Sequence, residues 1–179
     1  MGLSALSVSS DDLFARRTLN DVHVLAPRLH FLTSKTLQRL HDGAIAPFDF
    51  QLTIAAGSKN NVVARAVERF VVSYDVWQEK FSVVRISDRR NGGMNSSASA
   101  AEAWCVNNIF VPGSKLPAGE QLWARLEIRT VDQRTSSGAV SDNGISIISL
   151  VELFSRPPRL QQDRWTLETA PFRLEDLKQ

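Results

Sequence analysis

Four side chains offer groups for nucleophilic or metal chemistry: the single thiol of Cys105 and the imidazoles of His23, His30 and His41. A cysteine nucleophile needs a base beside it, and a zinc site needs several ligands at close spacing. No histidine lies within sixty residues of Cys105 in the sequence, and no two histidines have a ligand spacing. We therefore predict a buried thiol, three histidines with local structural roles, and neither a metal nor a cofactor.

Glycine-containing segments that could hold a phosphate are incomplete. Gly57–Lys59 and Gly113–Lys115 each read Gly-Ser-Lys, but both lack the glycine five residues upstream that a P-loop requires. Gly92 and Gly93 follow two arginines and could hold an anion through backbone amides. A loop of this kind is also typical of a strand-to-helix connection, which we favour. The chain has no Gly-x-Ser-x-Gly motif for a hydrolase nucleophile, and we expect a protein that is not an enzyme.

The composition is that of a globular protein. Of the 179 residues, 43% are hydrophobic and 22% are charged, which argues against a disordered or collagen-like chain. The best candidate for a membrane span, 145–154, is far shorter than the ~20 apolar residues that a spanning helix needs. A formal net charge of +2 does not require the basic stripe of a nucleic-acid-binding protein. We expect no transmembrane span and no nucleic-acid partner.

Arginine supplies most of the positive charge, with 16 Arg against 5 Lys. Within 122–131, Trp123, Arg125, Glu127 and Arg129 alternate with apolar residues, which places them on one side of a strand. An aromatic ring among bases could contact single-stranded nucleic acid or an acidic ligand. The alternative, which we favour, is a solvated sheet face on which Glu127 offsets the two arginines.

The elements that would position these groups are mostly strands joined by short loops. Residues 1–18 have weak periodicity and are predicted to form a flexible tail, and 19–179 a single β-rich domain. The strongest loop signal lies at 88–97. The order predicts an α+β fold, with a mainly antiparallel β-sheet or a sandwich-like sheet and two or three short helices packed on it. Strands are expected at 19–33, 47–54, 63–77, 81–86, 122–131 and 164–174, and helices at 33–43, 97–104 and 147–154.

One predicted hairpin carries an aromatic cluster. The segment 77–80 is expected to close the turn between two strands, and Tyr74, Trp77 and Phe81 lie around it. Aromatic side chains exposed at a turn could contact a partner, whereas the same residues could instead pack across the two strands as hairpin core. We take Tyr74, Trp77 and Phe81 as the candidate partner-binding residues.

The segment Tyr74–Phe81 reads Tyr-Asp-Val-Trp-Gln-Glu-Lys-Phe. It resembles the hairpin Tyr-Asp-Leu-Trp-Glu-Glu-Lys-Tyr of a family of uncharacterised bacterial exported proteins with a domain of unknown function. The resemblance covers roughly residues 20–90 and includes the short helix at 33–43, the strand at 48–54 and Arg69. Because that family has no established catalytic residues, the resemblance implies only an envelope-facing β-rich module.

These observations lead to two functional hypotheses. The first is a non-enzymatic β-rich binding or interaction module of the bacterial cell envelope, with a protein partner. The resemblance implies a periplasmic or otherwise exported location; residues 1–12 do not read as a signal peptide, so a cytoplasmic location is the alternative. The second hypothesis is a binder of a small hydrophobic ligand or lipid, held in an apolar cavity between the sheet and the helix at 147–154.

Overall fold

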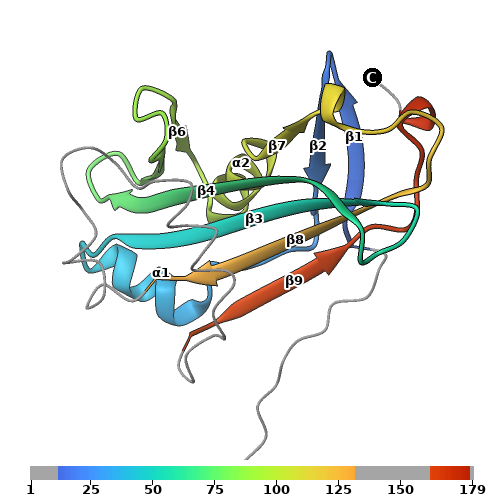
Figure 1. Ribbon diagram of the computed structural model, residues 1–179. Helices are drawn as coiled ribbons and strands as arrows, with labels where there is room; N and C mark the ends of the chain where they lie inside the picture. The colour runs from blue at the N-terminus through green and yellow to red at the C-terminus, as the bar shows by residue number, and fades with distance from the viewer. Residues whose placement is uncertain (1–11, 132–161, 178–179) are drawn as a thin grey trace, which may run out of the picture.

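The computed structural model describes residues 12–131 and 162–177, which form two antiparallel sheets and two α-helices (Figure 1). The larger sheet has six strands in the order β6-β5-β4-β3-β8-β9, and the smaller has three in the order β1-β2-β7. The predicted α+β class with a mainly antiparallel sheet is confirmed. The strands of the large sheet are β3 (Ala46–Ala56), β4 (Val62–Asp75), β5 (Lys80–Arg85), β6 (Gly92–Asn95), β8 (Leu122–Thr130) and β9 (Arg164–Glu168).

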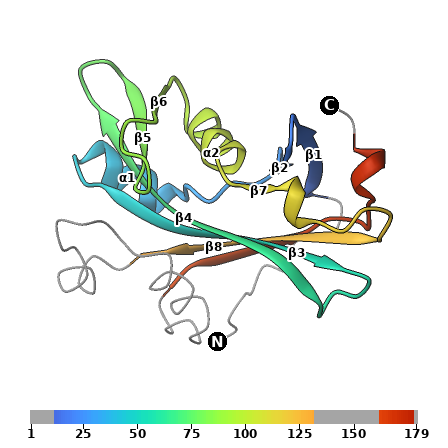
Figure 2. The ribbon, with the colours of Figure 1, turned by 45° about the horizontal axis from the view of Figure 1, so that its top comes forward.

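The helices and the small sheet lie on one side of the large sheet (Figure 2). They cover that face as a second layer, so most residues of the large sheet that point toward them are expected to be apolar. The elements of this layer are α1 (Ser34–His41), α2 (Ala98–Asn107), β1 (Phe14–Thr18), β2 (Asp21–Leu25) and β7 (Phe110–Pro112); two short 3-10 helices span Gly113–Lys115 and Leu174–Asp176.

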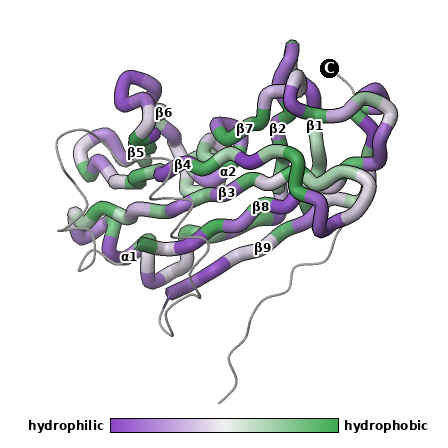
Figure 3. The backbone as a smooth tube through the Cα atoms, in the orientation of Figure 1, coloured by the Kyte–Doolittle hydropathy of each residue, from purple (hydrophilic) through white to green (hydrophobic). Residues whose placement is uncertain are grey.

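Strand β3 is the centre of the fold, because it pairs along its length with β4 on one side and β8 on the other. Its alternating apolar residues form the covered face, and hydropathy alternates visibly along the neighbouring strands (Figure 3). Phe48 and Phe50 are at most 1% exposed, and Phe31 packs edge-on against them with ring centroids 4.8 and 5.4 Å away. The strand predicted at 47–54 is therefore confirmed, and the aromatic contacts anchor the segment between β2 and α1 to the sheet.

The opposite face of β3 carries Asp49, Gln51 and Thr53, and these polar residues are also buried. Asp49 is 0% exposed and accepts two hydrogen bonds from Arg69 of β4, with Nε 2.5 Å from Oδ1 and Nη2 2.7 Å from Oδ2. Burial raises the pKa of Asp49, although its contacts with Arg69 act in the opposite direction. The expectation of a solvated sheet face is therefore wrong for the middle of this sheet.

Glu127 of β8 gathers three arginines on the same face. Its Oε1 lies 3.1 Å from Nη2 of Arg125 and 2.6 Å from Nη2 of Arg164, and its Oε2 lies 3.6 Å from Nη2 of Arg129. The predicted offset of Arg125 and Arg129 by Glu127 is confirmed. Its surroundings differ from the prediction, because Glu127 is only 6% exposed and Arg129 only 3%. Burial lowers the pKa of Arg129, and the positive charge of Arg164 adds to this effect.

A side-chain hydroxyl caps the start of each of the two α-helices. Thr33 precedes α1, and its hydroxyl accepts a hydrogen bond from the Thr36 amide at 3.4 Å. Ser97 precedes α2 and accepts from the Ala100 amide at 3.1 Å. Each cap satisfies an amide that the first helical turn leaves without a partner. Gly43 follows α1 with a φ of +85°, the left-handed geometry expected at the end of a helix.

The predicted tail is wrong for its last residues. Phe14–Thr18 form β1, which pairs antiparallel with β2, and Leu13 is 2% exposed in the core. Strand propensity depends on the surface a residue packs against, so β1 is specified more by its partner strand than by its own residues. The strand predicted for 19–33 also ends earlier, at Leu25, and Phe31 is buried outside any strand.

Two short strands were not predicted: β6 lies within the loop expected at 88–97, and β7 lies in a stretch for which no element is expected. Gly93 pairs with Val83 of β5, and a Cβ atom on Gly93 would lie 2.5 Å from Nε1 of Trp104. The missing side chain therefore allows α2 to lie close against β6, which is a known role of glycine in strands. The helix predicted at 147–154 lies outside the described residues.

The Asp49–Arg69 pair leads to a stability prediction. Replacing Arg69 with Met removes the hydrogen-bonded counter-ion of a buried carboxylate, and we expect a loss of about 3–5 kcal/mol in unfolding free energy at pH 7. The pKa of Asp49 is higher in the folded than in the unfolded protein, so the folded state binds the proton more tightly. The stability that this supplies is greatest below the unfolded-state pKa and is lost as the pH rises through the folded-state pKa. Without Arg69 this pKa rises further, so the loss should be larger at pH 7 than at pH 5.

Urea denaturation at the two pH values measures the effect. Arg65→Met is the matched control, because Arg65 lies on the same face of β4 but is exposed. We expect this variant to change stability by less than about 0.5 kcal/mol. A loss in Arg69→Met that has the same size at both pH values would contradict the role assigned to Asp49.

Candidate functional site

The candidate aromatic residues lie in the hairpin of β4 and β5, whose last cross-strand pair is Asp75 with Lys80. The four-residue turn between them contains no glycine, so other residues must supply its geometry. Asp75 Oδ1 accepts hydrogen bonds from the amides of Trp77 at 2.9 Å and Gln78 at 3.0 Å. Glu79 adopts a φ of +52°. The carboxylate of Asp75 thus holds the first half of the turn, and the left-handed backbone of Glu79 completes it.

Tyr74 and Phe81 fasten the hairpin to the body of the protein. They are directly opposite each other across the two strands, with ring centroids 5.0 Å apart. His41, in the last turn of α1, lies 4.0 Å from the Tyr74 ring and 6.2 Å from the Phe81 ring. Phe81 is only 6% exposed. These two candidates therefore belong to the packing between hairpin and helix, the second of the two roles that the sequence left open.

Trp77 has a different environment. It sits in the turn itself and is 97% exposed, and its neighbour Val76 is 61% exposed. An indole with almost its whole surface in water gains nothing from packing, so it contributes little to the stability of the fold. The structure therefore brings Tyr74 and Phe81 together and places Trp77 apart from them, as an exposed aromatic residue on an anchored support.

Two further exposed apolar residues lie at this end of the sheet. Met94 of β6 is 51% exposed and pairs with Ser82, which in turn pairs with Ser73. Ile45 is 49% exposed and directly precedes Ala46, which pairs with Val72. Sequence reasoning missed both residues, since Met94 falls in a predicted loop and Ile45 between two elements. Both residues could have been found by extending the alternation of inward-facing and outward-facing side chains from the hairpin into the strands beside it.

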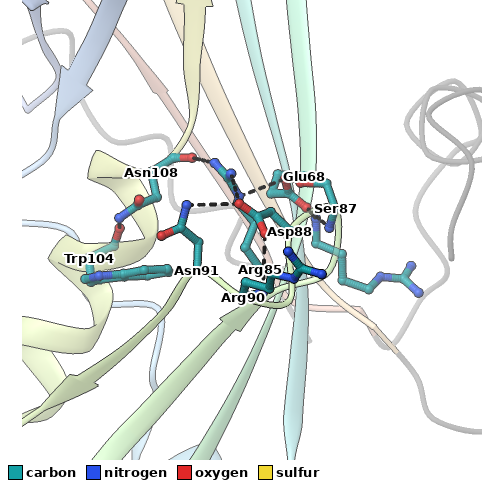
Figure 4. Close-up of polar contacts among 9 residues, drawn as sticks. Glu68, Arg85, Ser87, Asp88, Arg90, Asn91, Trp104 and Asn108 are labelled. Atoms are coloured by element: carbon teal, nitrogen blue, oxygen red, sulfur yellow. Dashed lines mark hydrogen bonds and ion pairs between the residues drawn. The ribbon is translucent and has the colours of Figure 1, made fainter.

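A polar cluster at the other end of β5 is the second place where reactive groups come together (Figure 4). Glu68 of β4 accepts a short hydrogen bond from the Ser87 hydroxyl, and Arg85 Nε lies 3.6 Å from its Oε2. Arg85 Nη2 also lies 3.5 Å from Asp88 Oδ2. Asp88 accepts hydrogen bonds from the Asn91 side chain at 3.0 Å and from a backbone amide at 3.3 Å.

This cluster is built to hold a turn. A serine beside a carboxylate is a possible nucleophile and base. Glu68, however, also accepts from the amides of Arg69 at 2.9 Å and Ser87 at 3.2 Å, so its acceptor positions are largely used. Arg85 donates to the Asn108 carbonyl at 3.4 Å, which links the turn to the end of α2. The contacts thus position β6 and α2, and we assign the cluster a structural role.

Two of the histidines and the cysteine have structural environments within the protein. His23 donates from Nδ1 to the Asn107 carbonyl at 3.0 Å, and His30 donates from Nδ1 to the Glu102 carboxylate, also at 3.0 Å. Cys105 is buried at 0% exposure, which confirms the prediction for the thiol. Burial raises the pKa of this thiol, and the charge of Glu102 adds to the effect. A thiol in this state is a poor nucleophile.

Comparisons with known proteins find no protein-family model, curated protein or solved structure that matches the chain. Among residues 12–131 and 162–177, no helix is long and apolar enough to cross a membrane. In the same ranges, no three side chains of the usual metal-binding types come together. The geometry of the hairpin is therefore the main guide to function.

The two roles found in the hairpin can be separated by stability. We expect Phe81→Ala to lower the unfolding free energy by about 3–5 kcal/mol, because it removes a buried aromatic side chain. Trp77→Ala should change it by less than about 0.5 kcal/mol, because almost no surface is buried there. Thermal and urea denaturation of both variants measure the difference, and a large loss in Trp77→Ala would assign Trp77 to the core instead.

Proposed function

We propose that this protein is a non-enzymatic β-rich binding module that captures a protein partner at the turn between β4 and β5. The observation that carries the proposal is the 97% exposure of Trp77 on a turn whose base is packed against α1. Tryptophan is enriched among the residues that dominate binding energy in protein interfaces, because its large ring loses much water-exposed surface on contact. Exposed Val76 beside it extends the apolar surface available to a partner.

Because the base of the β4–β5 hairpin is fixed to the protein, binding at the tip of this hairpin is favoured. A loop that becomes ordered on binding loses conformational entropy, which weakens the complex. Here the Asp75 carboxylate holds the turn, and Tyr74 and Phe81 hold the strands, before any partner arrives. Two residues of opposite charge, Glu79 and Lys80, closely follow Trp77 in the sequence. Such residues are suited to the polar rim of an interface.

We further propose that the partner lies in the bacterial cell envelope. This part of the proposal rests on the resemblance of Tyr74–Phe81 to the hairpin of the exported family. The alternative of a small hydrophobic ligand or lipid stays a prediction, because the helix at 147–154 on which it depends lies outside the described residues. Fractionation of the producing cell tests the location, and recovery of the protein only from the cytoplasm would contradict it.

Partner capture by the tagged protein from a detergent-solubilised envelope fraction tests the binding site. We expect Trp77→Ala to reduce recovery of the specific partner, with an affinity loss of roughly thirtyfold, the level of a dominant interface residue. The melting temperature of the variant should stay that of the wild type.

Leu19→Ala is the matched control. Leu19 is also an apolar residue in a hairpin turn, between β1 and β2, and it is 83% exposed. Its replacement should leave partner recovery unchanged. Equal loss in both variants would indicate non-specific apolar adhesion, and equal recovery of a partner by wild type and Trp77→Ala would reject the tip as the contact.

A further inference from the structure

A second candidate site lies at the far end of the large sheet from the hairpin. There, a pocket of about 210 Å³ opens between β3, β8, β9 and the loop that follows β3. It lies on the sheet face opposite α1 and α2, because Thr53 and Arg125 share the alternation of Asp49 and Glu127. The lining residues that matter chemically are Thr53, Lys59, Asn60, Trp123, Arg125 and Glu168.

Two cations converge on one carboxylate in this pocket. Lys59 Nζ lies 2.8 Å from Glu168 Oε2, and Arg125 Nε lies 3.9 Å from Glu168 Oε1. The three residues come from the loop after β3, from β8 and from β9, so the fold itself brings them together. Because Lys59 and Arg125 are the cations and Glu168 the acid of the lining, the pocket carries one more positive than negative charge.

The cations keep donors for a ligand. A lysine ammonium has three N–H donors and an arginine guanidinium has five. The contacts within the described residues place one Lys59 donor on Glu168, and two Arg125 nitrogens near Glu127 and Glu168. Their side chains are 59% and 47% exposed, so an anion from solvent can reach both. An incoming anion can also displace Glu168, whose side chain is 34% exposed.

Trp123 adds an apolar wall beside these charges. It is partly exposed, lies next to Ala55 in the register of β8 with β3, and lines the same pocket. An indole beside a guanidinium and an ammonium is suited to a ligand that combines a flat ring with a negative group. The small volume favours a compact molecule over a polymer.

We propose that this pocket binds a small ring-bearing anion, with its ring against Trp123 and its carboxylate or phosphate between Lys59 and Arg125. The site is independent of the hairpin. The pocket lies where β4 begins and the hairpin where it ends, roughly 45 Å apart for 14 residues at about 3.3 Å each. Binding in the pocket therefore does not require that the hairpin captures a partner.

Calorimetric titration of the full chain with phenyl phosphate, benzoate, inorganic phosphate and benzyl alcohol tests the proposal, together with the NMR signal of the Trp123 indole N–H. We expect saturable binding of phenyl phosphate or benzoate and a shift of the Trp123 signal. Inorganic phosphate and benzyl alcohol, which each lack one of the two features, should bind at least about tenfold more weakly. Equal binding of benzyl alcohol would remove the role of the cations.

The variants Arg125→Gln and Lys59→Gln should each weaken phenyl phosphate binding by about tenfold or more. Lys59 is in an exposed loop, so its variant keeps the test valid if Arg125→Gln is unstable. Arg65→Gln is the control, because Arg65 shares the sheet face but does not line the pocket. An equal loss in Arg65→Gln, or an oligothymidine that binds tighter than phenyl phosphate, would overturn the proposal.

Discussion

The pairing of charges on the second face of β3 is the constraint on which the rest of the structure depends. A central strand that is buried on both faces is ordinarily apolar throughout. β3 instead carries Asp49 on its buried polar face. Its charge is compensated by Arg69 of β4, which donates two hydrogen bonds to it, and by the nearby positive charge of Arg129 of β8. The register of β3 with β4 therefore cannot slip without separating the buried carboxylate of Asp49 from its hydrogen-bonded partner Arg69.

The same face changes character along the sheet. In the middle, Glu127 holds three arginines in a largely buried network. Toward the end of β3, the cations become exposed and border the pocket beside Trp123. A buried polar network can lock a register, whereas the same residue types at the open end of the sheet keep donors available to solvent. One sheet face thus serves both specificity of folding and a candidate ligand site.

Much of the fold could be predicted from local patterns. The strands β3 and β8 and the helices α1 and α2 were predicted, because the patterns that indicate them depend on neighbouring residues only. The burial of Asp49 could not be predicted, since a polar residue in an alternating strand has the same pattern whether its face is wet or covered. For the site, the aromatic cluster was found, but Trp77 could be separated from Phe81 only once the turn was known to start at Asp75.

The pairing of β3 with β8, a strand far from it in the sequence, has a consequence for synthesis of the chain. β3 to β6 form a continuous meander of hairpins, but Ala56 must pair with Leu122 and Val22 with Val111, so both sheets are completed by residues translated much later. Until then, one edge of β3 has open backbone groups beside a row of phenylalanines. Such edges favour aggregation, and contacts between distant residues slow folding. During synthesis, the nascent protein therefore passes through a stage in which β3 is prone to aggregation. This stage ends when β8 has been synthesised and pairs with β3.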